Sequence, residues 1–131
     1  MIKIGLLSDT HTYHRDIIIP EDLDLFIFAG DFSDRGEIYQ VVDFLEWLRS
    51  LKCKNIVWIA GNHDLTTDKS LMLNPSQGSI ESLLNRQKYY DVKHLIKELP
   101  PHIHSLENSS VEIEGFIIWG SPISPTFGYL S

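Results

Sequence analysis

Apolar residues in this sequence gather in short runs that predict β-strands. The runs cover residues 2–7, 23–29, 56–60 and 111–119. The second and third runs are almost continuously apolar, which is typical of strands that are covered on both faces of a parallel sheet. Turn residues at Asn108-Ser109 and Glu114-Gly115 predict that residues 105–119 form a β-hairpin or a meander.

Two further segments have the periodicity of amphipathic helices. Between the second and third strands, apolar residues recur at helical spacing at Ile38, Val41, Val42, Leu45 and Leu48. A strand, a helix and a strand in this order predict a right-handed parallel crossover. A second helix is expected over 89–99, ended by Pro100 and Pro101, and the polar residues 66–79 are expected to form a loop.

Composition and charge narrow the class of protein. The length of 131 residues suits a single domain with a core of its own. The net charge of -7 argues against strong nucleic-acid binding, which needs a basic surface. No apolar stretch approaches the roughly 20 residues of a membrane span, and the first residues do not resemble a signal peptide. Cys53 is the only cysteine, so an internal disulfide is excluded and a cytoplasmic location is expected.

The first three predicted strands all end in polar residues that can hold a metal ion or a proton. The endings are Ser8-Asp9-Thr10-His11, residues 30–36 (GDFSDRG) and Gly61-Asn62-His63-Asp64. The carboxyl ends of neighbouring parallel strands lie side by side, so we expect these donors to meet in one crevice. Gly30 and Gly61 permit the tight turns and close backbone approach that such a site needs.

Each ending alone has an ordinary structural explanation. Asp and Asn after a strand are favoured turn residues and helix N-caps, so a plain α/β interaction domain would also contain them. Three such endings on consecutive strands are harder to explain in that way. Together they supply carboxylate, imidazole and amide donors. This mixture is typical of a site for Mn, Fe or Zn and not of a sulfur-rich structural site.

The motifs D-x-H, G-D-x-x-D-x-G and G-N-H-D, in this order from Asp9 to Asp64, resemble those of the calcineurin-like metallophosphoesterases. Gly120-Ser121-Pro122 is similar to a motif of the small phosphodiesterase branch of that family. The resemblance implies an α/β fold, a sandwich of α/β/β/α layers whose N-terminal portion contains a mostly parallel sheet. It also implies a hydrolase that acts on phosphodiesters.

The resemblance further implies a dinuclear metal centre. Asp9 and His11 would bind the first ion, Asp31 would bridge both ions, and Asn62 would bind the second. Manganese is expected, with iron, zinc or magnesium as alternatives. Two ions about 3.5–4 Å apart can share a water, lower its pKa and hold phosphate oxygens for in-line attack. The substrate would be a phosphate-ester small molecule or a nucleotide.

The remaining candidate residues would act on the substrate. By resemblance, His63 is the general acid or a phosphate-facing donor, and Asp64 orients its ring. Asn62 and His63 would both face the phosphate. Arg35 is either a phosphate clamp or a solvated surface residue, since a guanidinium matches phosphate oxygens. Asp34 is expected to cap the following helix or to brace the loop, with a direct catalytic role as the alternative.

The family pattern continues with a lone histidine and a G-H-x-H motif, and neither is present before Ser131. We therefore expect residues 1–131 to form a single domain that is incomplete at its C-terminus, with a weak second metal site. An alternative is a catalytically impaired module that only binds metal or phosphate. One apolar face of the sheet would lack its cover, so self-association or a missing C-terminal half is expected.

Other histidines are weaker ligand candidates. His102 and His104 have the spacing of a ligand pair, but they are expected at the start of a strand. His94 is expected on the surface of a helix, and His14 in a solvated loop.

Overall fold

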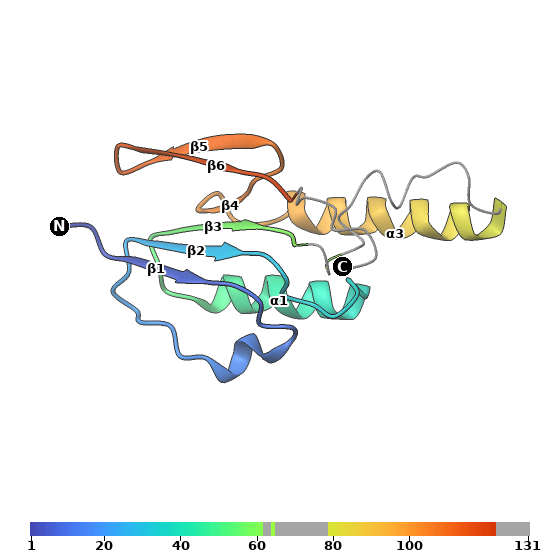
Figure 1. Ribbon diagram of the computed structural model, residues 1–131, viewed down its shortest axis with the longest axis horizontal. Coiled ribbons are helices and arrows are strands. Elements are labelled where there is room, and N and C mark those ends of the chain that lie inside the picture. Colours follow the sequence, from blue (N-terminus) through green and yellow to red (C-terminus); the bar gives the residue numbers. More distant parts are fainter. Residues whose placement is uncertain (62–63, 65–78, 123–131) are drawn as a thin grey trace, which may run out of the picture.

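A computed structural model describes residues 1–61, 64 and 79–122 of the chain. Its centre is a four-stranded sheet in the order β1-β2-β3-β4, in which every neighbouring pair is parallel (Figure 1). The strands are β1 (Ile4–Leu7), β2 (Leu25–Ala29), β3 (Asn55–Ile59) and β4 (Ile103–Ser105). The predicted parallel sheet and α/β fold class are thereby confirmed.

Helices cover one face of this sheet. α1 (Ile38–Ser50) connects β2 to β3 and lies along the sheet in Figure 1, as the apolar spacing predicted. α3 (Ser79–Lys97) precedes β4, and the short 3-10 helix η1 (Tyr13–Asp16) follows β1. In the part of the chain that the structure describes, no helix is long and apolar enough to cross a membrane.

The predicted start of the second helix was wrong. α3 begins at Ser79 rather than at residue 89. Its first half contains strong helix formers, but Leu83 and Leu84 there are 67% and 59% exposed. Ile80, Leu83 and Leu84 do have helical spacing, but they remain exposed. The buried face of α3 lies in its second half, where Val92 is fully buried.

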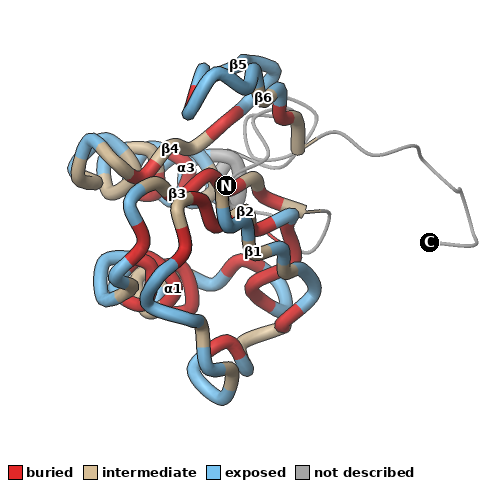
Figure 2. Tube along the Cα trace, turned by 90° about the vertical axis from the view of Figure 1, so that its left-hand side faces the viewer, coloured by how far each residue is buried: buried red, intermediate tan, exposed pale blue. Residues whose placement is uncertain are grey.

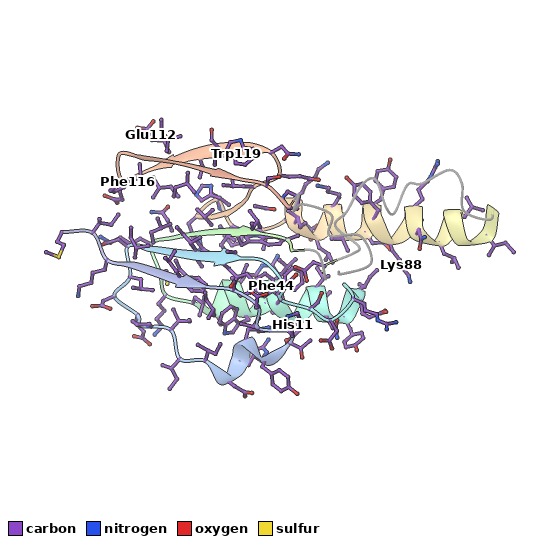
Figure 3. All side chains as sticks on the ribbon, viewed as in Figure 1. His11, Phe44, Lys88, Glu112, Phe116 and Trp119 are labelled. Atoms are coloured by element: carbon purple, nitrogen blue, oxygen red, sulfur yellow. The ribbon has the colours of Figure 1, made fainter. Side chains whose placement is uncertain are left out.

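The main hydrophobic core lies between the sheet and the helices. Alternate residues of β2 and β3 point toward α1, as Phe28 and Trp58 do, and both are at most 1% exposed. Phe44 of α1, labelled in Figure 3, lies among their rings and stacks on Phe32 at 4.1 Å between ring centroids. Figure 2 shows this region as mostly buried.

The opposite face of the sheet is covered by a β-hairpin. β5 (Ser109–Ile113) and β6 (Phe116–Gly120) pair antiparallel, and Leu106 and Ile113 pack against Leu25 and Val57. Glu114 and Gly115 connect the strands with φ values of 54° and 82°, the left-handed conformations that a tight two-residue hairpin turn uses. The predicted hairpin and its turn are confirmed.

The hairpin packs on β2 and β3 but leaves apolar residues of β1 exposed. Ile4 and Leu6 are opposite Leu25 and Ile27 in the sheet register, yet they are 45% and 74% exposed. The outer edge of this face therefore has the exposed apolar surface expected from the sequence. That another copy of the chain or a missing C-terminal half covers this surface stays a prediction.

Candidate metal centre

The loops that follow β1 and β2 run side by side and are joined by backbone hydrogen bonds. The N–H groups of Asp9 and His11 donate to the carbonyl oxygens of Gly30 and Asp31, at 2.9 and 3.0 Å. The next bond, from Thr12 to Phe32, is 2.7 Å long. The parallel pairing of the two strands thus continues beyond their ends, and it brings the polar motifs of both loops together.

Three candidate ligands share an unusual backbone conformation. Asp9, His11 and Asp31 have φ values of 56°, 42° and 61°, in the left-handed region. This region costs a residue other than glycine roughly 1–2 kcal/mol. Such conformations persist where the surrounding structure holds them, and they concentrate at functional sites. Here the hydrogen bonds between the two loops hold them.

The side chains of Asp9, His11 and Asp31 converge. Each offers one ligand atom, and these atoms all lie within 4.8 Å of one another. Asp9 is exposed, His11 is half-buried and Asp31 is 9% exposed, so the group lies at the surface with one buried member. Two carboxylates and one imidazole form a donor set that fits a divalent cation such as Mn, Fe or Zn.

The ring of His11 is oriented by a backbone contact. Its Nδ1 lies 3.3 Å from the carbonyl oxygen of Ser33. A carbonyl oxygen can only accept, so Nδ1 carries the proton in this contact and Nε2 keeps the lone pair that a metal ion requires. Figure 3 labels His11 near the carboxyl ends of β1 and β2.

Asp9 also has a local side-chain contact, because the Ser8 hydroxyl donates to Asp9 Oδ2 at 2.6 Å.

Gly30 and Gly61 are required where they lie. A Cβ on Gly61 would lie 2.1 Å from Asp31 Oδ1, and a Cβ on Gly30 would lie 2.9 Å from the Cα of Gly61. Gly30 also has a φ of 99°, which residues other than glycine rarely adopt. The close backbone approach expected at these two glycines is confirmed.

Asp64 lies behind this group and is fully buried. Its Oδ2 accepts the N–H groups of Asp31 and Gly61, at 2.9 and 2.8 Å. Its Oδ1 accepts the N–H and the hydroxyl of Ser33, at 3.0 and 2.6 Å. Burial raises the pKa of Asp64 above its ordinary value, although the hydrogen bonds from Gly61, Ser33 and Asp31 oppose this rise.

The backbone contacts of Asp64 were not predicted. The sequence indicated only that it orients His63, and His63 and Asn62 lie outside the described residues. Aspartate after a strand is a favoured turn residue, but turn chemistry does not indicate contacts with the loop after β2. Here Asp64 N–H also donates to the Gly61 carbonyl oxygen at 3.1 Å.

Of the two structural roles expected of Asp34, capping of α1 was wrong, and bracing of the loop stays a prediction. Glu37 is the N-cap residue, and it makes no capping hydrogen bond through its side chain. Asp34 is exposed, and its backbone N–H donates to Gln40 Oε1 at 3.3 Å. Gly36 lies between the two with a φ of 73°, a left-handed conformation that a right-handed helix does not contain, so α1 begins after it. Arg35 is exposed, which suits either of its two predicted roles.

The prediction that His14 lies in a solvated loop was also wrong. His14 is 1% exposed, and its ring packs against Phe44 and Trp47. Its Nε2 lies 2.8 Å from Asp43 Oδ2, which ties η1 to α1. Burial lowers the pKa of His14, and the contact with Asp43 only partly offsets this. No helical or strand periodicity surrounds His14 in the sequence, so its burial could not be predicted from there.

The other three histidines among the described residues lie outside this group. His94 is 72% exposed and pairs with Glu98 at 3.0 Å, so its predicted surface position is confirmed. β4 begins at Ile103, between His102 and His104, so they do lie at the start of a strand. Burial lowers the pKa of His104, and His102 adds to this effect.

Residues 2–121 match the family described as calcineurin-like phosphoesterase. This chain belongs to that family. Metallophosphoesterase domain-containing protein 1 of Homo sapiens is 36% identical over 130 residues, which is 92% of this chain and 37% of the relative. A UPF0046 protein of Caenorhabditis elegans is 32% identical over 130 residues, covering 98% of this chain and 43% of the relative. The chain thus spans less than half the length of these two members of the family.

Proposed function

We propose that this chain forms the metal-binding part of a metal-dependent phosphoesterase that hydrolyses phosphodiesters. The observation that carries this proposal is the convergence of Asp9, His11 and Asp31, with ligand atoms within 4.8 Å of one another. The group lies at the carboxyl ends of parallel strands, where α/β sheets bind ligands. Membership of the calcineurin-like phosphoesterase family makes phosphate esters the natural substrate class.

Divalent ions in this group would supply Lewis-acid stabilisation of phosphate oxygens and a water of lowered pKa. Asp9 and His11 are proposed to hold the first ion, with the Ser33 carbonyl fixing the His11 ring at 3.3 Å. By its position in the motifs, Asp31 is proposed to bridge to a second ion, and its side chain lies beside the bare backbone of Gly61 in the next loop. Manganese is the metal proposed.

Proton transfer and phosphate binding are proposed for residues of the same loops. His63 would protonate the leaving alkoxide, and Asn62 would bind the second ion and face the phosphate. Arg35 is exposed in the loop between β2 and α1. Its guanidinium would bind an anionic substrate from the solvent-exposed side of the site. These three roles rest on the order of residues in the motifs.

A second candidate function is that of a metal- or phosphate-binding module without turnover. Within residues 1–61, 64 and 79–122, one group of at least three metal-ligating residues is found, which suffices for one ion. A single ion binds phosphate but does not provide the paired clamp of a two-metal site. Binding without hydrolysis would distinguish this module from the enzyme.

The test measures hydrolysis of an activated aryl phosphodiester with added Mn²⁺, together with Mn²⁺ binding by calorimetry. The enzyme proposal predicts saturable hydrolysis that Asp31→Asn and His11→Gln each reduce by at least about 100-fold. Glu112→Gln on the exposed strand β5 is the control and should leave the rate unchanged. Mn²⁺ binding without hydrolysis would favour the binding module. Unchanged rates in both site variants would contradict the proposed site.

A further inference from the structure

We propose that Asp64 is a positioning residue, whose buried carboxylate fixes the backbone of Asp31 and so sets the geometry of the metal group. This inference rests on the proposed metal site and deepens it. It assigns to Asp64 a role in the backbone of the loops, separate from the contact with His63 that the sequence indicated.

Asp64 joins the loops after β2 and β3 through both of its oxygens. Oδ2 accepts from Asp31 in one loop and from Gly61 in the other, at 2.9 and 2.8 Å. Oδ1 accepts twice from Ser33. Asp64 and Ser33 are fully buried and Asp31 is 9% exposed, so the N–H groups of Asp31 and Ser33 would lose this acceptor in the protein interior, where water does not replace it.

The bond to Asp31 N–H acts directly on a proposed ligand. Asp31 has a φ of 61°, and its backbone is held from both sides. The carboxylate of Asp64 accepts the Asp31 N–H, and the Asp31 carbonyl oxygen accepts the N–H of His11 at 3.0 Å. A continuous chain of hydrogen bonds therefore runs from Asp64 through Asp31 to His11. A change at Asp64 should move two proposed ligands, although Asp64 binds no metal itself.

The four donors require a carboxylate rather than an amide. An ionised carboxylate accepts at both oxygens, whereas an amide has one oxygen and one NH2 group. In Asp64→Asn, the NH2 group would face N–H donors of Asp31 and Gly61, or the N–H of Ser33. The variant keeps the size and shape of Asp64 but places donor against donor. Its effect therefore reports on the hydrogen bonds and not on packing.

Three variants separate positioning from general stability. Asp64→Asn breaks the network. Ser33→Ala removes one donor to Asp64, the hydroxyl at 2.6 Å, together with the acceptor of the Gly36 N–H at 2.9 Å. Val92→Ala is the matched control, because it removes buried methyl groups from α3 and Val92 packs in the core of the helix face. All variants are compared well below their melting temperatures.

The first measurement is amide hydrogen exchange in the metal-free chain. Asp64→Asn should speed exchange at Asp31, Ser33 and Gly61, and Val92→Ala should leave these amides at the wild-type rate. Wild-type exchange at these three amides in Asp64→Asn would overturn the inference. This readout needs no metal, so it decides the inference even if the proposed function fails.

The second measurement is Mn²⁺ affinity by calorimetry. Asp64→Asn should bind Mn²⁺ about 10–100-fold more weakly, as for other residues that orient metal ligands. Ser33→Ala should show a smaller loss, and Val92→Ala should bind as tightly as the wild type. An equal loss in Val92→Ala and Asp64→Asn would overturn positioning in favour of general destabilisation. A wild type that binds no Mn²⁺ would count against the proposed function alone.

Discussion

Gly61 and Asp31 lie so close that a single added carbon would not fit between them. A Cβ at Gly61 would lie 2.1 Å from Asp31 Oδ1 and 2.5 Å from its backbone nitrogen. The neighbours are backbone and a proposed metal ligand, so neither can yield without moving the site. The proposed metal group therefore requires glycine at position 61.

We predict that Gly61→Ala destabilises the fold by about 1–3 kcal/mol, as overpacking typically does, and abolishes Mn²⁺ binding. Gly115→Ala is the matched control. Gly115 has a φ of 82° with no atom near its added Cβ, so alanine there should cost roughly 1–2 kcal/mol of strain without affecting the metal. Thermal unfolding and calorimetry measure the two effects. Wild-type Mn²⁺ affinity in Gly61→Ala would refute the prediction.

We predict that the free energy of unfolding falls as the pH drops through the ordinary histidine value of 6.5. Burial lowers the pKa of His14 in the folded chain, so the unfolded chain binds more protons between the lowered value and 6.5. The contribution of neutral His14 to stability is complete above pH 6.5. It is lost as the pH falls toward the lowered pKa of the folded chain. Protonation would also place an N–H at Nδ1, which has no hydrogen-bond partner among the described residues.

Urea unfolding at several pH values, in wild type and His14→Gln, checks this prediction. His14→Gln should reduce the loss of stability at acid pH. It should not remove the loss, because burial lowers the pKa of His104 as well. His94→Gln, at a 72% exposed position, should keep the wild-type pH dependence. A profile for His14→Gln that matches the wild type would contradict the prediction.

The aromatic core supports the site, because Phe32 directly follows Asp31 and stacks on Phe44 with an angle of 5° between the rings. We predict that Phe44→Ala costs about 3–5 kcal/mol of unfolding free energy, the range for deleting a buried phenylalanine. Chemical denaturation measures this cost. Tyr39→Ala, at a 70% exposed position of the same helix, should change stability by no more than about 0.5 kcal/mol. Comparable losses in both variants would be inconsistent with the core described.

The exposed apolar residues of β1 predict association. Leu6 is 74% exposed beside Ile27, which packs under the hairpin. Leu6→Ser should leave stability nearly unchanged and lower the fraction of associated chains in sedimentation velocity, because it removes contact area from the patch. Tyr39→Ser is the control and should associate as the wild type does. A wild type that stays monomeric at high concentration would contradict this prediction.

The parallel sheet, α1 and the hairpin could be predicted because each has a local signal in the sequence. The runs at β2 and β3 are almost continuously apolar, and α1 has its apolar residues at helical spacing. The convergence of Asp9 and Asp31 could also be expected, since parallel strands place their carboxyl ends together. The structure adds the hydrogen bonds that join the two loops.

What could not be predicted depends on contacts between distant residues. His14 is buried because Asp43, in another element, supplies its partner. The first half of α3 is helical although Leu83 and Leu84 remain exposed, so no buried face marks it. The hydrogen bonds of Asp64 depend on the meeting of the loops after β2 and β3, and no spacing along the chain encodes that arrangement.

The central claim is that Asp9, His11 and Asp31 bind one divalent cation together. Anomalous diffraction from crystals grown with Mn²⁺ tests it most directly, because it locates the metal without reference to activity. The account predicts a manganese peak within coordination distance of all three side chains. A peak elsewhere on the chain, or none at this group at saturating Mn²⁺, would contradict it.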